Sequence, residues 1–485
     1  MTFNSWEFLL FYPIVALLYF VLPKRARWIM LLIASYYFYM CYQAELVFLI
    51  AGTTLVSWLA SRAIERSESR AVRRFFLTLT LVVCFGVLFF YKYFNFLADS
   101  AVGVITLLGG QPTFTGLSLM LPVGISFYTF QTLSYVIDVY RGDVKTEKNF
   151  FFYALFVSFF PQLVAGPIER PDNLIPQLKE HHRFTQDNFV KGAKHMLVGF
   201  FKKVVVADTL ALYVDAVYNA PTEATGLSVA IASLLFGVQI YCDFSGYTDI
   251  AIGCARIMGI RLMKNFDHPY MATSVKEFWS RWHISLSTWF KDYLYFPLGG
   301  NRRGTVRTYL NLMIVFMVSG LWHGANWTFV IWGALHGLYQ CIGRFTFKKR
   351  QTILNNIGLS PDGRLVSWVR RVNTTLLVTL AWVFFRANSV TDASTLLRAL
   401  FTDWAHSPTE VLSGMGLTPV AIVTVLLSFI TLLIIDRLLT YDDALDGSDA
   451  LVRHGAWIYY VWGILILWGW LLSQSLGGTF IYFQF

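Results

Sequence analysis

The chain has 485 residues, of which 56% are hydrophobic and 14% charged, and its mean hydropathy is +0.53. A soluble domain carries about 25% charged residues, so this composition excludes an ordinary soluble protein. The net charge of +10 would suit nucleic-acid binding, but the basic residues are scattered between apolar stretches, as in the loops of membrane proteins. We therefore predict an all-helical, polytopic membrane protein that does not bind nucleic acid.

Many stretches of the chain approach the length of a membrane span, which is about 20 apolar residues. Several are short or interrupted by glycine and proline, so we expect about 11 true spans, with the others re-entrant or interfacial. The first stretch, residues 6–22, lacks both the preceding basic region and the cleavage site of a signal peptide. We therefore expect it to be a membrane span that is not removed. The candidate spans are residues 6–22, 28–42, 46–60, 75–97, 118–137, 150–166, 195–216, 227–255, 306–323, 325–345, 372–388, 418–439 and 456–475.

Lysines and arginines in the N-terminal loops indicate an orientation, because these residues accumulate on the cytoplasmic side. They occur at 23–27, 61–74 and 141–149, whereas the connections at 43–45 and 98–116 contain none. We therefore expect the N-terminus to be outside. The acidic stretch 442–449 is expected to be a solvated connection.

The sequence changes character after residue 161. Four prolines between 161 and 176 would break any long helix, and irregular backbone at membrane depth is tolerated only inside the protein or along a cavity. Most polar groups that adjoin apolar sequence lie in residues 161–303. Within a single membrane domain, 1–485, we expect N-terminal helices in 1–150, the functional core in 161–345 and C-terminal helices in 365–485.

Residues 276–295 carry two sets of side chains at helical spacing. This segment is too charged to face lipid across a full span, so it either lies in the membrane interface or lines a wet tunnel inside the protein. Its cations, Lys276, Arg281 and Lys291, can attract an anionic substrate. The aromatic face comprises Phe278, Trp282, Leu286, Trp289 and Tyr293. The polar stripe comprises Lys276, Ser280, His283, Ser287 and Lys291.

The stretch 318–337 is almost wholly apolar but carries His323 and His336. An ionisable side chain in hydrocarbon, which costs about 2.5 kcal/mol or more for the strongly charged types, needs a partner, a wet cavity or a function. Histidine exchanges protons near neutral pH, so His323 is our candidate catalytic base; a structural histidine bonded to a neighbouring helix is the alternative. On a continuous helix His336 would point about 140° away, so we expect it to have a structural or supporting role.

Glycines in the same stretch predict close helix packing. Gly320 and Gly324 form one small-xxx-small pair, and Gly333 and Gly337 form another. Such pairs let two helices approach closely. At 100° per residue His323 lies within about 60° of the first pair, so it should border the packed seam.

Two carboxylates, Asp243 and Asp249, lie in an otherwise apolar stretch. Six residues apart, they face different sides of a helix, and each is expected to pair with an arginine or to cap a broken helix. A proton relay, or substrate binding by Asp243, is the weaker alternative. The GxSxG, P-loop, GxGxxG and HExxH motifs are absent from the sequence. A metal site on His283 and His323 lacks an obvious third ligand, so we expect no metal.

Seven short stretches together carry a family resemblance. They are LPVGISFY at 121–128, QLVAGPI at 162–168, DFSGY at 243–247, EFWSRWHIS at 277–285, YFPLGG at 295–300, GLWHG at 320–324 and FIYFQF at 480–485. With these stretches the chain resembles the membrane-bound O-acyltransferase superfamily, and within it the bacterial branch of the alginate O-acetyltransferase membrane subunit. The relatives that transfer D-alanine toward teichoic acids are close to this branch.

The resemblance implies a ring of tilted helices around a thinned centre, with a funnel from each membrane face meeting at a histidine. His323 matches the family's invariant intramembrane histidine, and His283 matches a second position that is His, Asn or Asp in different branches. The polar stripe would line the cytoplasmic funnel. The location would be a bacterial inner membrane, among its lipids.

We therefore expect acyl transfer, of acetyl in the first instance, from a cytoplasmic thioester such as acetyl-CoA, with no bound cofactor. His323 would deprotonate or position the acceptor hydroxyl, and His283 would polarise the thioester carbonyl. The final acceptor would be an exopolysaccharide such as alginate, reached through a periplasmic or extracellular partner. The alternatives are a transporter or flippase of an acyl donor or lipid-linked sugar, D-alanyl transfer to a cell-wall polymer, and a scaffold whose partner performs the catalysis.

Overall fold

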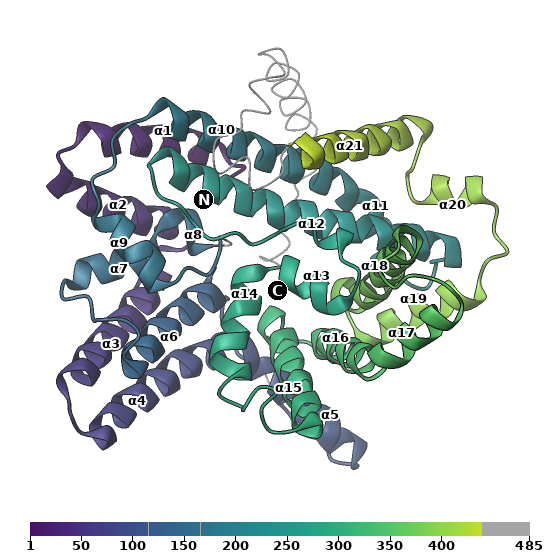
Figure 1. Ribbon diagram of the computed structural model, residues 1–485, viewed down its shortest axis with the longest axis horizontal. Coiled ribbons are helices and arrows are strands. Elements are labelled where there is room, and N and C mark those ends of the chain that lie inside the picture. Colours follow the sequence, from purple (N-terminus) through teal and green to yellow (C-terminus); the bar gives the residue numbers. More distant parts are fainter. Residues whose placement is uncertain (115, 165, 439–485) are drawn as a thin grey trace. The chain divides into compact units, whose positions relative to one another are not determined.

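The computed structural model describes residues 1–114, 116–164 and 166–438, and this part of the chain is helical almost throughout (Figure 1). Its one β pairing is an isolated antiparallel bridge between Phe266 and Trp282. The predicted all-helical class is confirmed. The predicted span 456–475, the acidic stretch 442–449 and the terminal motif 480–485 lie outside the described residues.

Four helices in the described ranges are long and apolar enough to cross a bilayer. A fifth candidate is a pair of helices, Pro408–Gly414 and Pro419–Ile434, bent by 82° at a short break. The total of about 11 spans stays a prediction. The four helices are Ala44–Arg66, Arg70–Leu107, Gly226–Ile257 and Thr305–His323.

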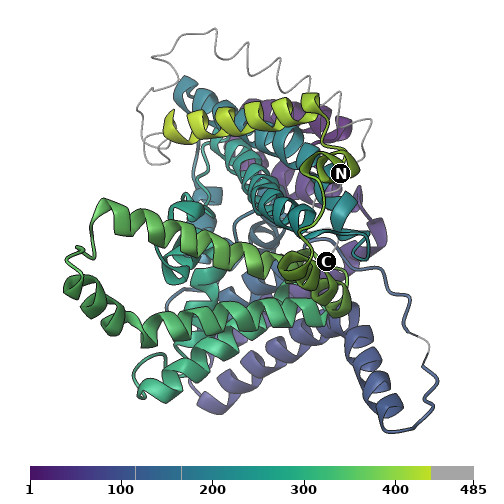
Figure 2. The same ribbon diagram turned by 90° about the vertical axis from the view of Figure 1, so that its right-hand side faces the viewer.

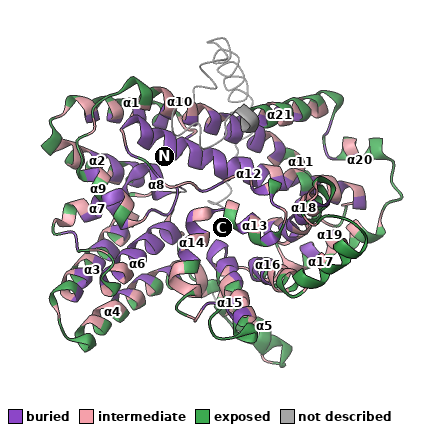
Figure 3. Ribbon diagram, in the orientation of Figure 1, coloured by how far each residue is buried: buried purple, intermediate pink, exposed green. Residues whose placement is uncertain are grey.

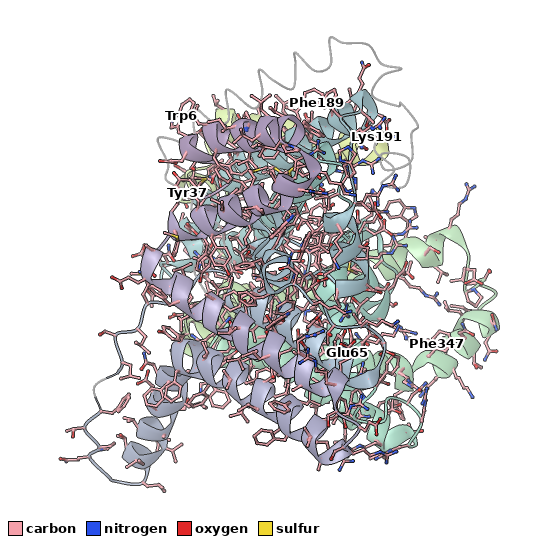
Figure 4. The ribbon with its side chains drawn as sticks, turned by 90° about the vertical axis from the view of Figure 1, so that its left-hand side faces the viewer. Trp6, Tyr37, Glu65, Phe189, Lys191 and Phe347 are labelled. Carbon is pink, nitrogen blue, oxygen red and sulfur yellow. The ribbon has the colours of Figure 1, made fainter. Side chains whose placement is uncertain are left out.

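Large apolar side chains are exposed along many helices, as contact with lipid requires. Trp6 and Tyr37, on the first two helices, are 57% and 55% exposed and can be seen projecting outward (Figure 4). The buried residues follow the inner faces of the helices instead (Figure 3). The molecule thus presents an apolar exterior, in contrast to the polar exterior of a soluble protein.

The chain forms two compact units, and the first comprises residues 1–196 and 247–263. Its core is aromatic: Phe3 and Phe38 pack around Phe8, and the Tyr12 hydroxyl donates to the Cys254 carbonyl at 2.9 Å. Its helices are α1 (Trp6–Val21), α2 (Lys24–Met40), η1 (Ala44–Leu46), α3 (Val47–Arg66), α4 (Arg70–Leu88), η2 (Phe89–Tyr93), α5 (Phe94–Leu107), α6 (Ile125–Arg141), α7 (Phe150–Ser158), α8 (Phe160–Leu163), α9 (Pro171–Lys179), most of α10 (Gln186–Phe200) and the end of α12 (Gly226–Ile257).

Proline and glycine set several helix ends in this unit. Helix α6 begins at Ile125, later than the predicted span 118–137, because Pro122 and the left-handed Gly124 precede it. Helix α7 ends at Ser158, before the prolines that were expected to break it. Conversely, α5 continues to Leu107 through much of the predicted connection at 98–116, because no proline interrupts that stretch before residue 112.

The second unit comprises, among the described residues, 197–246 and 264–438. Helix α12 contributes residues to both units. The other helices of the second unit are η3 (Phe201–Ala207), α11 (Asp208–Tyr218), η4 (Pro269–Met271), α13 (Val275–Arg281), α14 (Ile284–Phe290), η5 (Lys291–Tyr295), α15 (Thr305–His323), α16 (Trp327–Phe345), α17 (Phe347–Asn356), α18 (Arg364–Arg386), α19 (Val390–Thr402), α20 (Pro408–Gly414) and α21 (Pro419–Leu438).

Helices α15 and α16 form a hairpin, with α18 against α16 (Figure 2, green). The glycine pairs allow this contact, as predicted. A Cβ on Gly320 would collide with the Phe329 carbonyl oxygen, and one on Gly333 would collide with that of Phe316. The turn ends at Asn326, whose side chain caps α16 by accepting from the Thr328 N–H at 3.0 Å. His323 is therefore the last residue of α15, and the helix is not continuous toward His336.

Candidate functional site: a histidine centre and its cavity

His283 occupies a break between two short helices. The sequence predicted one helix through residues 276–295, but α13 ends at Arg281 and α14 starts at Ile284. His283 has a φ of +44°, in the left-handed region, which costs a non-glycine residue roughly 1–2 kcal/mol. A strained backbone of this kind persists only where the surroundings enforce it, and such positions cluster at functional sites.

Asn265 and its neighbours hold this break in place. The Ile284 N–H donates to the Asn265 carbonyl at 2.9 Å, and the Asp267 N–H donates to the Arg281 carbonyl at the same distance. The Asn265 side-chain oxygen accepts from the Ser285 hydroxyl at 2.6 Å and lies 3.4 Å from His283 Nδ1. An extended segment thus pairs with both sides of the break and holds the His283 backbone in place.

His283 and His323 meet in the interior of the second unit. Their ring centroids are 6.2 Å apart, and the residues are 0% and 3% exposed. A reacting atom sits about 3 Å from each group that acts on it, so two rings about 6 Å apart can flank one acyl carbon. Burial lowers the pKa of His283, which lies outside the candidate membrane spans, to about 3. His283 is therefore neutral at pH 7, with one N–H donor and one acceptor nitrogen.

Aromatic rings enclose the two imidazoles. Phe244 lies 4.7 Å from His283, while Trp332 and Phe385 lie 5.1 and 5.5 Å from His323, all between ring centroids. These walls come from α12, α16 and α18. Inside such a low-dielectric enclosure, hydrogen bonds to a developing charge are stronger than in water. We call His283, His323 and these three rings the histidine centre.

His336 has a defined structural partner. The Trp279 indole Nε1 donates to His336 Nδ1 at 3.1 Å, joining α13 to α16. The His336 ring also lies 5.0 Å from Trp332, whose ring contacts His323 as well. His336 therefore contacts two of the surrounding side chains, and its supporting role stays a prediction.

A cavity of about 390 Å³ is lined by residues that lie close to both histidines in the sequence, although neither histidine is on its wall. Its wall includes Ile284, which follows His283, and Ser319, one turn before His323. Four of the five polar-stripe residues line it, which favours a position inside the protein for this stripe. His283 is the one stripe residue that is not on the cavity wall, because the helix breaks at that position. The full lining is Lys276, Trp279, Ser280, Ile284, Leu286, Ser287, Thr288, Phe290, Lys291, Tyr295, Leu312, Val315, Phe316, Ser319 and Gln340.

Two predicted substrate-binding residues lie elsewhere. Arg281 is not part of the cavity wall; its Nη2 pairs with Glu277 at 2.8 Å. Partial burial opposes ionisation of Glu277, but hydrogen bonds from Thr273 and the charge of Arg281 lower its pKa. Asp243 forms a buried ion pair with Lys203 at 2.6 Å, and the same ammonium lies 2.7 Å from Asp208. The partner of Asp243 is thus a lysine where an arginine was expected.

Sequence reasoning missed several residues that build the site. Asn265 belongs to no recognisable motif, and nothing in the pattern pairs it with residues 281–285. Trp279 was not assigned to either helical face, although it is in the EFWSRWHIS stretch. Lys203 could have been found, because an isolated Lys-Lys pair within an apolar stretch needs anionic partners. In the described residues no group of three or more His, Cys, Asp or Glu side chains could hold a metal ion.

The chain is similar to known membrane acyltransferases over most of its length. Residues 144–354 match the model of the membrane-bound O-acyltransferase family, a range that contains both histidines and the whole cavity wall. "Probable alginate O-acetylase AlgI" of Pseudomonas aeruginosa is 42% identical over 435 residues, which cover 89% of this chain and 81% of that relative. The chain belongs to the membrane-bound O-acyltransferase family.

Two further relatives show the range of names within this family. "Peptidoglycan O-acetyltransferase" of Helicobacter pylori is 34% identical over 80% of this chain and 77% of its own. "Teichoic acid D-alanyltransferase" of Bacillus subtilis is 27% identical over 48% of this chain and 62% of its own. This family member is thus a multi-pass membrane acyltransferase, and its similarity is more extensive to the O-acetyl-transferring relatives than to the D-alanyl-transferring one.

Proposed function

We propose that the protein transfers an acetyl group from a cytoplasmic thioester across the membrane for O-acetylation of an exopolysaccharide such as alginate. The observation that carries the proposal is the approach of His283 and His323 to 6.2 Å between ring centroids, near a cavity whose wall carries two lysines. The alginate O-acetylase similarity supports acetyl as the group and alginate as the polymer. D-alanyl transfer has weaker support, because the similarity to that relative covers only about half of the chain.

In the proposed reaction His323 removes the proton of an acceptor hydroxyl as its oxygen attacks the thioester carbonyl carbon. General base catalysis of this kind contributes typically about 10²–10⁴ in rate. His283, neutral and in the tautomer with its proton on Nε2, donates a hydrogen bond from Nε2 to the carbonyl oxygen as that oxygen gains negative charge, a contribution on the order of 10²–10³. The tetrahedral adduct then expels the thiolate, which takes the proton from His323. In total, one proton moves from the acceptor hydroxyl to the departing thiol, and His323 returns to its neutral starting state.

The cavity suits the donor side of this reaction. Lys276 and Lys291 are exposed on its wall, and Ser280 and Ser287 supply hydroxyl groups between them. Two cations on one wall attract a phosphate-bearing thioester such as acetyl-CoA. The wall also contains apolar residues of α15, namely Leu312, Val315 and Phe316. These suit the uncharged arm of the thioester donor, which carries the acetyl group. We propose that the donor enters here, with no resident cofactor.

The setting of the reaction is a bacterial inner membrane with the N-terminus outside, as the distribution of loop cations indicates. Donor and acceptor then approach from opposite faces, so they never share a compartment. The acetyl group reaches the polymer through a periplasmic or extracellular partner. The names of the polysaccharide-modifying relatives support this role.

The test is a His323→Ala variant compared with a matched His406→Ala control. His406 is half-exposed beside Asp403, away from the histidine centre in sequence and contacts. With both variants at wild-type levels in the membrane, we expect polymer acetylation to fall to background in His323→Ala and to persist in the control. Wild-type acetylation with His323→Ala would contradict the proposal. Acetyl transfer by the purified chain from acetyl-CoA would separately exclude a scaffold role.

A further inference from the structure

A second cavity, of about 350 Å³, lies in the first unit, at the turn between α1 and α2. Lys24, Arg25, Arg27 and Lys179 line it, and Glu180 is the one carboxylate on its wall. None of these residues belongs to the histidine centre or to the cavity beside it. We call this the basic cavity, and the reaction proposed above makes no use of it.

Two of its cations are already used to build the site. Arg27 donates to the backbone carbonyls of Leu22, Phe20 and His182 at 3.0, 3.2 and 2.5 Å, so it joins the α1–α2 turn to the segment after α9. Lys179 is paired with the buried carboxylate of Glu147. These contacts hold Arg27 and Lys179 in the wall, and within the described residues Arg27 has no carboxylate partner to neutralise its charge.

The other two cations on the cavity wall, Lys24 and Arg25, have no partner within the described residues. Lys24 and Arg25, in the first turn of α2, are exposed, and neither forms an ion pair or side-chain hydrogen bond within the described residues. A helix N-terminus adds positive potential to them. The nearby His181 titrates below its usual range, because slight desolvation and the charges of Arg27 and Lys24 lower its pKa. The cavity mouth is therefore a concentrated site of positive charge.

The remaining wall is aromatic and adjoins exposed apolar surface. Trp28 stacks on Phe152 with ring centroids 4.6 Å apart, and Tyr19 lies under the Arg27 guanidinium. On the same two helices, Val21 at the end of α1 is 71% exposed and Ile33 on α2 is 65% exposed. A ligand that fits this surface has an anionic head for the cavity and hydrocarbon chains for the adjoining helix faces.

We propose that the basic cavity binds the phosphate headgroup of an anionic phospholipid, with the acyl chains along α1 and α2. Basic pockets between apolar helices on the cytoplasmic side recognise such headgroups, and residues 23–27 form a predicted cytoplasmic loop. A cation near a membrane surface contributes about fivefold in affinity, so Lys24 and Arg25 together contribute about 20- to 30-fold.

The test measures lipid binding to the purified full chain in neutral detergent by native mass spectrometry. Dioleoylphosphatidylglycerol is the probe, dioleoylphosphatidylcholine the zwitterionic control, and inorganic phosphate the free-anion competitor. The site variant is Lys24→Gln with Arg25→Gln, and the control is Lys348→Gln with Lys349→Gln, a second exposed basic pair, on α17. We expect phosphatidylglycerol affinity to fall about 20- to 30-fold in the site variant and by less than twofold in the control.

Three results would overturn the lipid assignment: equal affinity for both lipids in the wild type, unchanged phosphatidylglycerol affinity in the site variant, or inorganic phosphate binding as tightly as the lipid. The comparison of lipids in the wild type does not depend on the variant folding. Its preference for phosphatidylglycerol should weaken in 0.5 M salt, because screening shortens the reach of the cations. None of these outcomes depends on acyl transfer, so the test is independent of the proposed function.

Discussion

The end of α15 and the middle of α16 each place a buried histidine against the same ring, Trp332, yet the two positions differ in chemistry. His336 is 0% exposed and uses Nδ1 to accept from Trp279, a bond between two helices. His323 is 3% exposed, ends its helix, and faces a second imidazole, His283. Burial and residue type therefore do not distinguish the two histidines. The neighbouring imidazole of His283 is what supports our proposal that His323, and not His336, is the base.

The contrast between His323 and His336 would be weakened most if the imidazole of His283 were dispensable for acetyl transfer. His283→Ala should reduce acetyl transfer on the order of 10²–10³, because it removes the donor to the developing oxyanion. His283→Asn retains an N–H donor and should keep more activity than the alanine variant. Rates with saturating thioester check both. Equal rates in the alanine variant and the wild type would remove His283 from the reaction.

The hairpin of α15 and α16, which carries His323 and His336, depends on the close contact at Gly320. Gly320→Ala should lower the thermal midpoint of the purified protein, because the added methyl meets the Phe329 carbonyl and overpacking costs about 1–3 kcal/mol. Gly343→Ala is the control on α16, since a Cβ there meets nothing within 4 Å. A Gly320→Ala midpoint as high as that of the control would show that the helices separate without cost.

The lysines of the cavity next to the centre should affect donor binding more than chemistry. Lys276→Gln with Lys291→Gln should raise the KM for acetyl-CoA by about fivefold to tenfold, as expected for loss of attraction to an anionic donor, and leave kcat within twofold. The Lys348→Gln, Lys349→Gln variant controls for net charge. A fall in kcat at unchanged KM would contradict donor binding at this wall.

A modest effect on catalysis is expected at His336. His336→Phe keeps a ring in place but removes the acceptor for Trp279, a net loss of about 0.5–1.5 kcal/mol. Acetyl transfer should fall by less than tenfold, together with a small drop in the thermal midpoint. Trp279→Phe should reproduce the effect, and the double variant should be no worse than either single one. Additive losses would show that the hydrogen bond is not what the two residues share.

Periodicity and glycine spacing predicted much of this architecture. The spacing of the aromatic face identified its buried side, and the glycine pairs identified the α15–α16 contact. The break at His283 was not predictable, since it depends on residues 265–267 pairing with both sides of it, and Asn265 and His283 are 18 residues apart. The helical period remained informative there because the four other stripe residues still line one cavity.

The buried ion pairs show a related limit. Asp243 was recognised as a carboxylate in need of a cation, but its partner depended on how α12 packs against η3 within the second unit. Lysine and arginine both satisfy the sequence rule, and only the packing selects Lys203. The sequence predicts that a buried carboxylate needs a cationic partner, whereas the identity of that partner is known only from the fold.

The most direct test of the central claim compares His323→Ala and His336→Ala in one assay. Both proteins would be purified at matched quality, and acetyl transfer from acetyl-CoA would be measured with saturating donor and acceptor. If His323 is the base, its variant should lose at least about 100-fold, while His336→Ala should lose less than about tenfold. A His323→Ala rate near the wild type, or equal losses in the two variants, would contradict the assignment of catalysis to the end of α15.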